Sequence, residues 1–393
     1  MRPLAIDRRK FIRKATAVTS AAGLLSVFPK ELLGNRTMEE KQIGEAPTII
    51  SRRAVTRIRF AVIGINHGHI YGQCDAVMRG GGELVSFHAK EEDLAAEFSK
   101  KYPQAQRVGD EKEILEDKSI QLVLSSIIPH ERAPLGIRVM QHGKDYMSDK
   151  PGITSLAQLA DVRRVQKQTG RIYSIMYSER LENRATIKAG ELVKAGAIGK
   201  VIQTIGLGPH RTNLSTRPSW FFDKKYFGGI ITDIASHQFD QFLFFTGSTK
   251  GEVVYSQTGN VAHPQYPLFE DFGDATIHGD GGTGYIRVDW FTPDGLQTWG
   301  DGRLTVLGTE GYIEIRKNID IAGRPGGNHL FLVNNKETQY IDCKDVTLPY
   351  GEQLVNDVLN RTETAMPQDH CFLAMELALK AQDRAKKLVL NKA

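Results

Sequence analysis

The stretch that decides the fold is residues 58–69, IRFAVIGINHGH. An apolar run ends at Gly64, a polar turn follows, and a plausible helix then extends to about Arg79. This order predicts a buried β-strand that reaches a tight turn at the start of a helix. A second apolar run at 84–87 follows the glycines at 80–82. The chain therefore opens as β-α-β with a glycine turn, which can set a helix N-terminus against a pyrophosphate.

The glycine pattern of this turn is incomplete. A G-x-G-x-x-G fingerprint would place glycine at Asn66 and His69. Asn66 is a mild departure because asparagine tolerates the left-handed conformation. Ala89 occupies the position where an acidic residue would bind ribose hydroxyls; Lys90 favours NADP, and the two glutamates that follow it favour NAD. The glycines alone therefore leave dinucleotide binding open.

Helices and strands alternate after this turn. The pattern predicts helices at 94–101, 133–142 and 155–168, and strands at 120–126, 145–147 and 172–176. Such alternation implies a parallel sheet, and ligands bind such sheets at the carboxyl ends of the strands. These ends carry Gly64, Ser125, Ser126, Lys150 and Tyr177, so one crevice could gather all five residues.

A second informative stretch is residues 226–240, YFGGIITDIASHQFD. It predicts a helix that begins after a glycine pair. Asp233 and His237 are four residues apart and would share one helix face. A carboxylate beside an imidazole is a candidate acid–base pair, because histidine titrates near neutrality. The alternative is an ordinary pair that supports the helix.

The rest of the C-terminal half predicts one further sheet. Its apolar or alternating runs lie at 201–206, 253–260, 275–279, 285–290, 304–307, 312–315 and 329–333, with helices at 182–194 and 371–390. Glycine-rich turns between the runs predict antiparallel pairing. We expect the uncovered face of this sheet to be an oligomer interface, in a homodimer or homotetramer.

The N-terminal 46 residues differ in charge from the rest. They hold nine Lys/Arg and five Asp/Glu, whereas the remainder holds 42 and 41. The nearly neutral body gives no indication of a nucleic-acid surface. Basic residues at 7–14 precede an apolar run at 15–28 that is too short for a membrane span, which is the order of a signal peptide. Arg8 and Arg9 before Phe11 resemble a twin-arginine export signal; an ordinary basic N-terminus is the alternative.

Residues 35–56 are predicted to form a linker. The first predicted segment, residues 1–46, contains the signal and the beginning of this linker. The sequence shows no clear cleavage site, so a signal that stays uncleaved and anchors the protein is an alternative. Three cysteines are too few for a disulfide framework or a zinc site, and we expect no metal.

The order of motifs resembles the Gfo/Idh/MocA oxidoreductases. The motifs are the glycine turn at 64–68, Ile-Pro-His at 128–130, Gly-Lys at 143–144, Asp-Lys-Pro at 149–151, Ala-Ile-Gly-Lys at 197–200, and G-G-x-x-x-D-x-x-x-H-x-x-D at 228–240. The resemblance covers about residues 57–390. It implies an α/β fold, with an N-terminal Rossmann-type parallel-sheet domain at 57–177 and a C-terminal α/β domain at 178–393 with an open, mainly antiparallel sheet.

The resemblance also implies roles for individual residues. Lys150 matches the family lysine between nicotinamide and substrate hydroxyl, and Asp233 and His237 match residues that hold the substrate, with the histidine as acid/base. Asp149 replaces the family glutamate. We expect the cofactor to contact Gly64, Ile65, Asn66, His67, Gly68, His69, Lys90, Ser125, Ser126, His130, Asp149 and Lys150. We expect the substrate to contact Tyr177, Arg180, His210, Arg211 and Trp220.

The function implied is NAD(P)-dependent oxidation of a CH–OH group of a sugar, glycoside or polyol. Export of the folded protein to the periplasm by the twin-arginine machinery would require a tightly bound cofactor, loaded in the cytosol. The alternatives are a redox-neutral, NAD-dependent glycoside hydrolase or lyase, a metal-dependent sugar isomerase, and a non-catalytic nucleotide- or sugar-binding protein.

Overall fold

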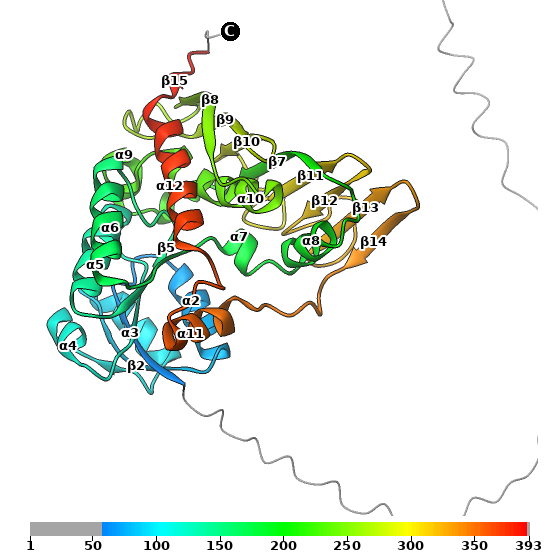
Figure 1. The fold of residues 1–393 in the computed structure, drawn as a ribbon. Coiled ribbons are helices and arrows are strands. Elements are labelled where there is room, and N and C mark those ends of the chain that lie inside the picture. The colour runs from blue at the N-terminus through cyan, green and yellow to red at the C-terminus, as the bar shows by residue number, and fades with distance from the viewer. Residues whose placement is uncertain (1–56, 391–393) are drawn as a thin grey trace, which may run out of the picture. The chain divides into compact units, whose positions relative to one another are not determined.

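The computed structural model describes residues 57–390 and begins with a six-stranded parallel sheet (Figure 1). Its strands are β1 (Ile58–Ile63), β2 (Gly82–His88), β3 (Gln106–Arg107), β4 (Leu122–Ser125), β5 (Asp145–Asp149) and β6 (Tyr173–Met176). They lie in the order β3-β2-β1-β4-β5-β6, with every neighbouring pair parallel. This is the strand order of a Rossmann fold, as expected.

Helices connect these strands. They are α2 (His69–Arg79), α3 (Glu92–Lys101), α4 (Glu111–Glu116), α5 (Pro129–Gln141) and α6 (Leu156–Thr169). Ser155 caps α6, and Asp110 with Glu113 forms a capping box at α4. The sequence patterns did not predict β3 and α4, because β3 has two exposed residues and α4 has six residues, too few for a clear periodicity.

A nine-stranded mixed sheet follows. Its strands are β7 (Val201–Pro209), β8 (Gly251–Gly259), β9 (Phe272–Gly279), β10 (Thr283–Asp289), β11 (Arg303–Gly308), β12 (Gly311–Arg316), β13 (His329–Asn334), β14 (Thr338–Asp342) and β15 (Lys386–Lys387). The order is β14-β13-β12-β11-β7-β10-β9-β8-β15. The pairs β7/β10 and β8/β15 are parallel and the others antiparallel, so the sheet is mainly antiparallel.

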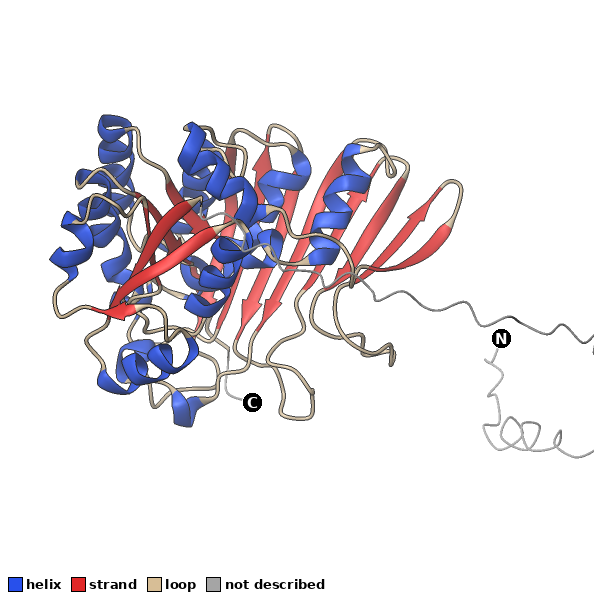
Figure 2. Ribbon diagram, turned by 90° about the horizontal axis from the view of Figure 1, so that it is seen from below, coloured by secondary structure: helices blue, strands red, loops and turns tan. Residues whose placement is uncertain are grey.

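Helices cover one face of this sheet (Figure 2). The elements that contact it are α8 (Arg184–Lys194), a π-helical segment η3 (Ile231–Ala235), α10 (Ser236–Thr246) and α12 (Gln368–Asp383). The other helical segments of this half are α7 (Ser178–Leu181), α9 (Lys224–Phe227) and α11 (Tyr350–Asn360), with short 3₁₀ turns at η1 (Leu214–Thr216) and η2 (Ser219–Phe222). The helix expected at 182–194 begins later, because Asn183 caps α8. On β7, a Cβ at Gly206 would lie 2.7 Å from the Gln238 side chain, so this glycine lets α10 approach the sheet.

Apolar side chains occupy the other face of the sheet. Ile205 on β7, Leu307 on β11 and Tyr312 on β12 are 36–41% exposed. Register pairs Leu307 directly with Tyr312. This is the face for which we predicted an oligomer interface.

The C-terminal segment returns to the first sheet (Figure 1). Helix α11 packs on α2, where a Cβ on Gly351 would lie 1.8 Å from the Ala76 carbonyl oxygen. Arg361, just after α11, binds Asp145 on β5 at 2.6 and 2.8 Å. The α11 region of the expected second domain, 178–393, therefore packs on the first domain rather than on the second sheet. No helix among residues 57–390 is both long and apolar enough to cross a membrane.

Candidate active site

A lysine–aspartate pair joins the end of β5 to the helical segment η3. Lys150 follows the last residue of β5, and Asp233 lies in η3. The Lys150 Nζ donates to Asp233 Oδ1 at 2.9 Å, and both residues are buried. Burial opposes ionisation of the carboxyl group, but the Lys150 ammonium outweighs it and lowers the pKa of Asp233. Both side chains line a cleft of about 260 Å³.

The backbone before Asp233 is held by protein groups. Gly228 and Gly229 have φ angles of 87° and 91°, which favour glycine. Glu270 accepts from the Ile230 amide at 3.0 Å, and Gln382 accepts from the Ile231 amide at 2.9 Å. The glycine pair therefore serves the turn, and these helix-terminal donors are already satisfied by the protein.

His237 has a different environment from the one expected. Asp233 bonds to Lys150 rather than to His237, and His237 Nδ1 is buried without a hydrogen-bond partner. The imidazole is 2% exposed and is not among the residues that line the cleft. Burial lowers the pKa of His237 to about 3. No direct Asp233–His237 hydrogen bond therefore forms among the described residues, and Asp233 itself lies in the π-helical segment η3.

A buried arginine that no sequence motif indicated fixes the loop around Lys150. Arg132 on α5 is 1% exposed. It donates to the carbonyls of Ile127 and Lys150, and its Nη2 lies 3.1 Å from Asp149 Oδ2. Its position inside an ordinary helical pattern gave no sequence signal, since only the fold brings these acceptors together.

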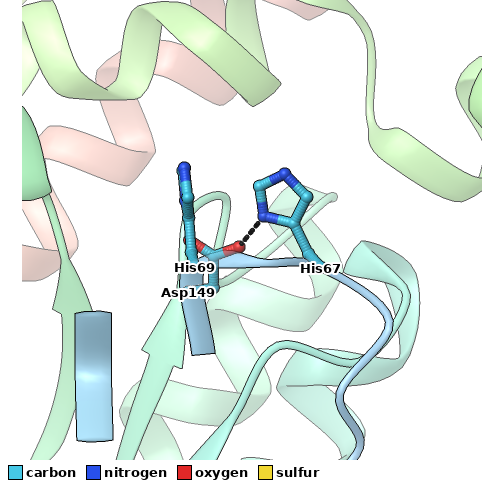
Figure 3. Close-up of side chains that lie close together, drawn as sticks. All are labelled: His67, His69 and Asp149. Atoms are coloured by element: carbon cyan, nitrogen blue, oxygen red, sulfur yellow. Dashed lines mark hydrogen bonds and ion pairs between the residues drawn. The ribbon is translucent and has the colours of Figure 1, made fainter. Parts of the chain in front are cut away.

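Two histidines converge on Asp149 (Figure 3). His67 Nδ1 lies 2.8 Å from Oδ2, and His69 Nδ1 lies 2.9 Å from Oδ1. Burial opposes ionisation of Asp149, but His69, Arg132 and His67 outweigh it and hold its pKa well below the usual range. Burial and His69 lower the pKa of His67 to about 4, so His67 is neutral and donates through Nδ1.

The same three side chains are close enough to hold a metal ion. However, Asp149 also accepts from Arg132 and from the Lys150 amide, so four donors already occupy its two oxygens. A metal bound there would have to displace some of these donors. The arrangement therefore orients two imidazoles as it stands, and the expectation of no metal remains a prediction.

The glycine turn has the geometry that a dinucleotide requires. Gly64 has φ 78°, and a Cβ there would lie 2.6 Å from the Ile127 side chain. No atom lies within 4 Å of a Cβ placed on Gly68, at the N-terminus of α2. Ser126 Oγ donates to the His67 carbonyl at 2.7 Å and ties β4 to the turn. The open backbone at Gly68 can thus receive a phosphate group.

A smaller cavity lies beside this turn. It is about 80 Å³, and its lining includes Gly64, Asn66, Lys90 and Glu91. Asn66 Nδ2 donates to Glu91 Oε1 at 2.7 Å. Glu91, two positions after Ala89, is thus an acidic side chain that lines this cavity. Its carboxylate can accept hydrogen bonds from ribose hydroxyls.

The other expected cofactor residues lie around this region. Ser125 is buried, and its Oγ accepts from the Ile127 amide at 3.2 Å. Ile65 is 5% exposed. His130 packs edge-on against Tyr226 at 5.0 Å, and its Nδ1 is buried without a partner. These three residues support the turn and the loop, and neither described cavity includes them.

Three of the five expected substrate residues line the main cleft. They are His210, Arg211 and Trp220, and the cleft also contains Asn213, Arg217, Phe221, Trp290 and Trp299, which were not predicted as substrate contacts. Burial, followed by Lys150, lowers the pKa of His210 to about 4, and His210 Nδ1 lies 3.0 Å from the Gly208 carbonyl. The cleft therefore combines aromatic faces with cationic and neutral nitrogen groups.

Tyr177 and Arg180 do not line the cleft and use their polar atoms elsewhere. The Tyr177 hydroxyl donates to the Cys371 carbonyl at 3.2 Å. Arg180 forms two bonds of 2.6 and 2.7 Å to Asp240, which also contacts His370. These interactions link α7 and α10 to α12, so the expectation of substrate contact by these two side chains is corrected to a structural role.

The fold and site define a dinucleotide-dependent oxidoreductase. The sequence matches "Oxidoreductase family, NAD-binding Rossmann fold" over residues 58–177 and "GFO/IDH/MocA C-terminal domain" over residues 186–314. The chain belongs to the Gfo/Idh/MocA family of oxidoreductases, with NAD or NADP as cofactor.

Relatives of this chain include sugar and polyol dehydrogenases. The scyllo-inositol 2-dehydrogenase (NAD⁺) of Bacillus subtilis is 26% identical over 266 residues, 66% of this chain and 74% of that protein. A levoglucosan dehydrogenase from Pseudarthrobacter phenanthrenivorans is 25% identical over 203 residues, 50% of this chain and 51% of that protein.

A solved structure is more similar. A protein of the oxidoreductase class from Erwinia carotovora atroseptica SCRI1043 has 46% identity and a TM-score of 0.82, covering 84% of this chain and all of that one. A levoglucosan dehydrogenase structure with NADH and levoglucosan has 15% identity and a TM-score of 0.68 over 83% of this chain and 95% of that one; it supports the fold alone.

Proposed function

We propose that this protein oxidises a CH–OH group of a sugar, glycoside or polyol with tightly bound NAD or NADP. The observation that carries the proposal is the buried Lys150–Asp233 pair, at 2.9 Å, in a cleft that also contains His67 and Trp220. An ammonium held by a carboxylate can position a hydroxyl, and an aromatic face suits the apolar side of a sugar ring.

The residues supply proton transfer and charge stabilisation. The nicotinamide, when bound, supplies the acceptor for the hydride that leaves the carbon with its electron pair. Lys150 Nζ has three donors, of which one serves Asp233, so another can stabilise negative charge that develops on the substrate oxygen. The hydroxyl proton passes to a neutral imidazole, for which His237 was the predicted acceptor.

His210 is a second candidate for the proton acceptor because it lines the cleft and His237 does not. Its Nδ1 faces the Gly208 carbonyl at 3.0 Å, which leaves Nε2 as the basic nitrogen. Comparing His210→Gln with His237→Gln tests the assignment. The variant that lacks the acceptor should lose about 10²–10⁴-fold in kcat with cofactor affinity retained. Equal, small losses in both variants would mean that neither imidazole takes the proton.

The residue pattern also supports a redox-neutral cycle as a second function. In such a cycle a glycoside is oxidised, cleaved by elimination or hydrolysis, and reduced again. Elimination needs a base besides the group that handles the hydroxyl proton, and the cleft contains His210 and His67 in addition to Lys150. Glycoside cleavage without net formation of reduced cofactor would favour this function. Net accumulation of oxidised sugar would favour the simple dehydrogenase.

We further propose periplasmic export by the twin-arginine route, with the cofactor loaded before export. The support is the Arg8-Arg9 pair and the apolar run that follows, which lie outside the described residues. Fractionation of cells that express the native chain and an Arg8→Lys/Arg9→Lys variant tests this localisation. Equal export of the two proteins would contradict it.

The first experiment identifies the cofactor. The protein is purified with its N-terminal segment intact and then denatured, and any released dinucleotide is identified by mass spectrometry. A stoichiometric NAD or NADP would support a captive cofactor. A protein that is empty and also fails to bind added NAD or NADP would contradict the proposed oxidoreductase mechanism.

A further inference from the structure

Two arginines in the main cleft lack a buried carboxylate partner. The cleft is lined by the cationic side chains of Arg132, Lys150, Arg211 and Arg217. Asp149 pairs with Arg132, and Asp233 pairs with Lys150. Arg211 and Arg217, both from the segment that follows β7, remain. The cleft therefore has an excess of positive charge where the segment after β7 lines it.

Arg217 is held in place by neutral groups. Its Nε donates to the Thr212 carbonyl at 2.8 Å, and its guanidinium lies 4.4 Å from the centre of the Phe221 ring and 5.1 Å from that of Trp290. Among residues 57–390, no carboxylate lies within 4.0 Å of this guanidinium. Partial burial lowers the pKa of Arg217, as expected for a cation with incomplete compensation. Its Nη1 has no hydrogen-bond partner among the described residues and remains available to a ligand.

Arg211 is oriented in a similar way. Its Nη2 donates to the carbonyls of Pro293, at 2.9 Å, and Leu296. Its nearest acidic group is Asp294, 3.7 Å from Nε, but the Asp294 side chain is fully exposed. A contact of that kind is screened by water and contributes little. Backbone carbonyls therefore fix the side chain while its charge stays largely uncompensated.

We propose that the substrate is an acidic sugar whose carboxylate binds Arg217 and Arg211. This inference deepens the proposed function and rests on it. A partly desolvated guanidinium is unfavourable without an anion, and its planar fork matches a carboxylate. Trp220 and Trp299 in the same cleft offer faces to a sugar ring, while Lys150 and Asp233 hold the reacting hydroxyl. A uronic acid, or a glycoside of one, has both groups on one ring.

The test compares matched pairs of sugars. D-Glucuronate is compared with glucose, D-galacturonate with galactose and D-mannuronate with mannose. Binding to the NADH-loaded protein is measured by calorimetry, and hydride transfer with NAD⁺ is followed by absorbance. We expect at least one uronate to bind about 10- to 100-fold more tightly than its neutral parent. A neutral sugar that binds as well as every uronate, or better, overturns the inference.

Substitutions in the cleft test whether the arginines cause the preference for uronates over neutral sugars. Arg217→Gln should reduce the ratio of uronate to neutral-sugar affinity by about tenfold or more, and Arg217→Lys should retain part of it. The exposed cation Lys225, on the same segment but outside the cleft, provides the control variant Lys225→Gln, which should leave the ratio unchanged. Melting temperature and NADH affinity of each variant show whether fold and cofactor site are intact. An unchanged ratio in a folded Arg217→Gln variant overturns the role of Arg217.

Other outcomes separate the two proposals. Glucose 6-phosphate serves as the phosphate probe, and tighter binding of this ester than of any uronate would overturn the carboxylate assignment. Oxidation of neutral sugars without any preference for uronates would leave the dehydrogenase proposal standing and refute the acidic substrate. Binding of NADH without binding or oxidation of any tested sugar would refute both.

Discussion

Removing the Lys150 ammonium should damage stability and catalysis by separable amounts. The perturbation is Lys150→Met, which keeps an unbranched side chain up to the ε position, removes the ammonium group and leaves the Asp233 carboxylate without its cation. The two side chains are 6% and 11% exposed. Loss of one partner of a fully buried pair costs about 3–5 kcal/mol. This pair borders a cleft that admits water, so we expect a loss of about 2–3 kcal/mol in the free energy of unfolding.

The expected change in melting temperature follows from size. About 330 residues form the folded unit. At roughly 2.1 cal/mol/K per residue, the unfolding entropy is about 0.7 kcal/mol/K, so Lys150→Met should melt about 3–4 °C lower. Loss of the cation at the substrate oxygen should lower kcat by about 10²–10³-fold.

A double-mutant cycle tests this reasoning. Lys150→Met/Asp233→Asn removes both charges. Its loss in the free energy of unfolding should therefore be smaller, by about 2 kcal/mol, than the sum of the losses in the two single variants. Its activity should remain as low as that of Lys150→Met. Calorimetric melting, NADH affinity and kcat are measured for all four proteins. Additive changes in stability would refute a buried ion pair, and an unchanged kcat in Lys150→Met would refute the catalytic role.

Four further predictions concern the turn, the cofactor, pH and the apolar face of the second sheet. Gly64→Ala should destabilise the protein by about 1–3 kcal/mol, measured by denaturant unfolding, because its positive φ and contact with Ile127 both oppose a Cβ; unchanged stability would contradict this. Glu91→Gln should weaken NAD⁺ binding more than NADP⁺ binding in calorimetry, since a carboxylate favours ribose hydroxyls over a 2′-phosphate; an equal effect on both would argue against contact with the ribose. His237 stays neutral in the fold down to about pH 3, whereas the unfolded chain takes up this proton near about pH 6.5, so the unfolding free energy should fall as pH drops between these values. His237→Gln should make that fall shallower in unfolding curves at several pH values, and an identical slope would refute the buried neutral imidazole. The apolar face of the second sheet should hold copies of the chain together, so Ile205→Arg should lower the mass measured by light scattering; an unaltered mass would place the interface elsewhere.

Local patterns in the sequence were sufficient for most of the fold. The apolar run before Gly64, the strand–helix alternation and the position of Lys150 at a strand end all follow from periodicity and turn chemistry, which act over a few residues. The same patterns predicted the second sheet and its mainly antiparallel pairing. They missed β3 and α4, because elements this short contain too few residues to show a period.

The partners of the charged groups depend on the tertiary structure. Lys150 and Asp233 are 83 residues apart in the chain, and only packing of the first sheet against η3 brings them within 2.9 Å. Asp233 bonds to Lys150 rather than to His237, and α12 brings His370 to Asp240 beside Arg180. A sequence specifies which residues can ionise. Burial and long-range neighbours decide which pairs form and which cations remain available to a substrate, because desolvation and Coulomb energies depend on distances that only the folded chain sets.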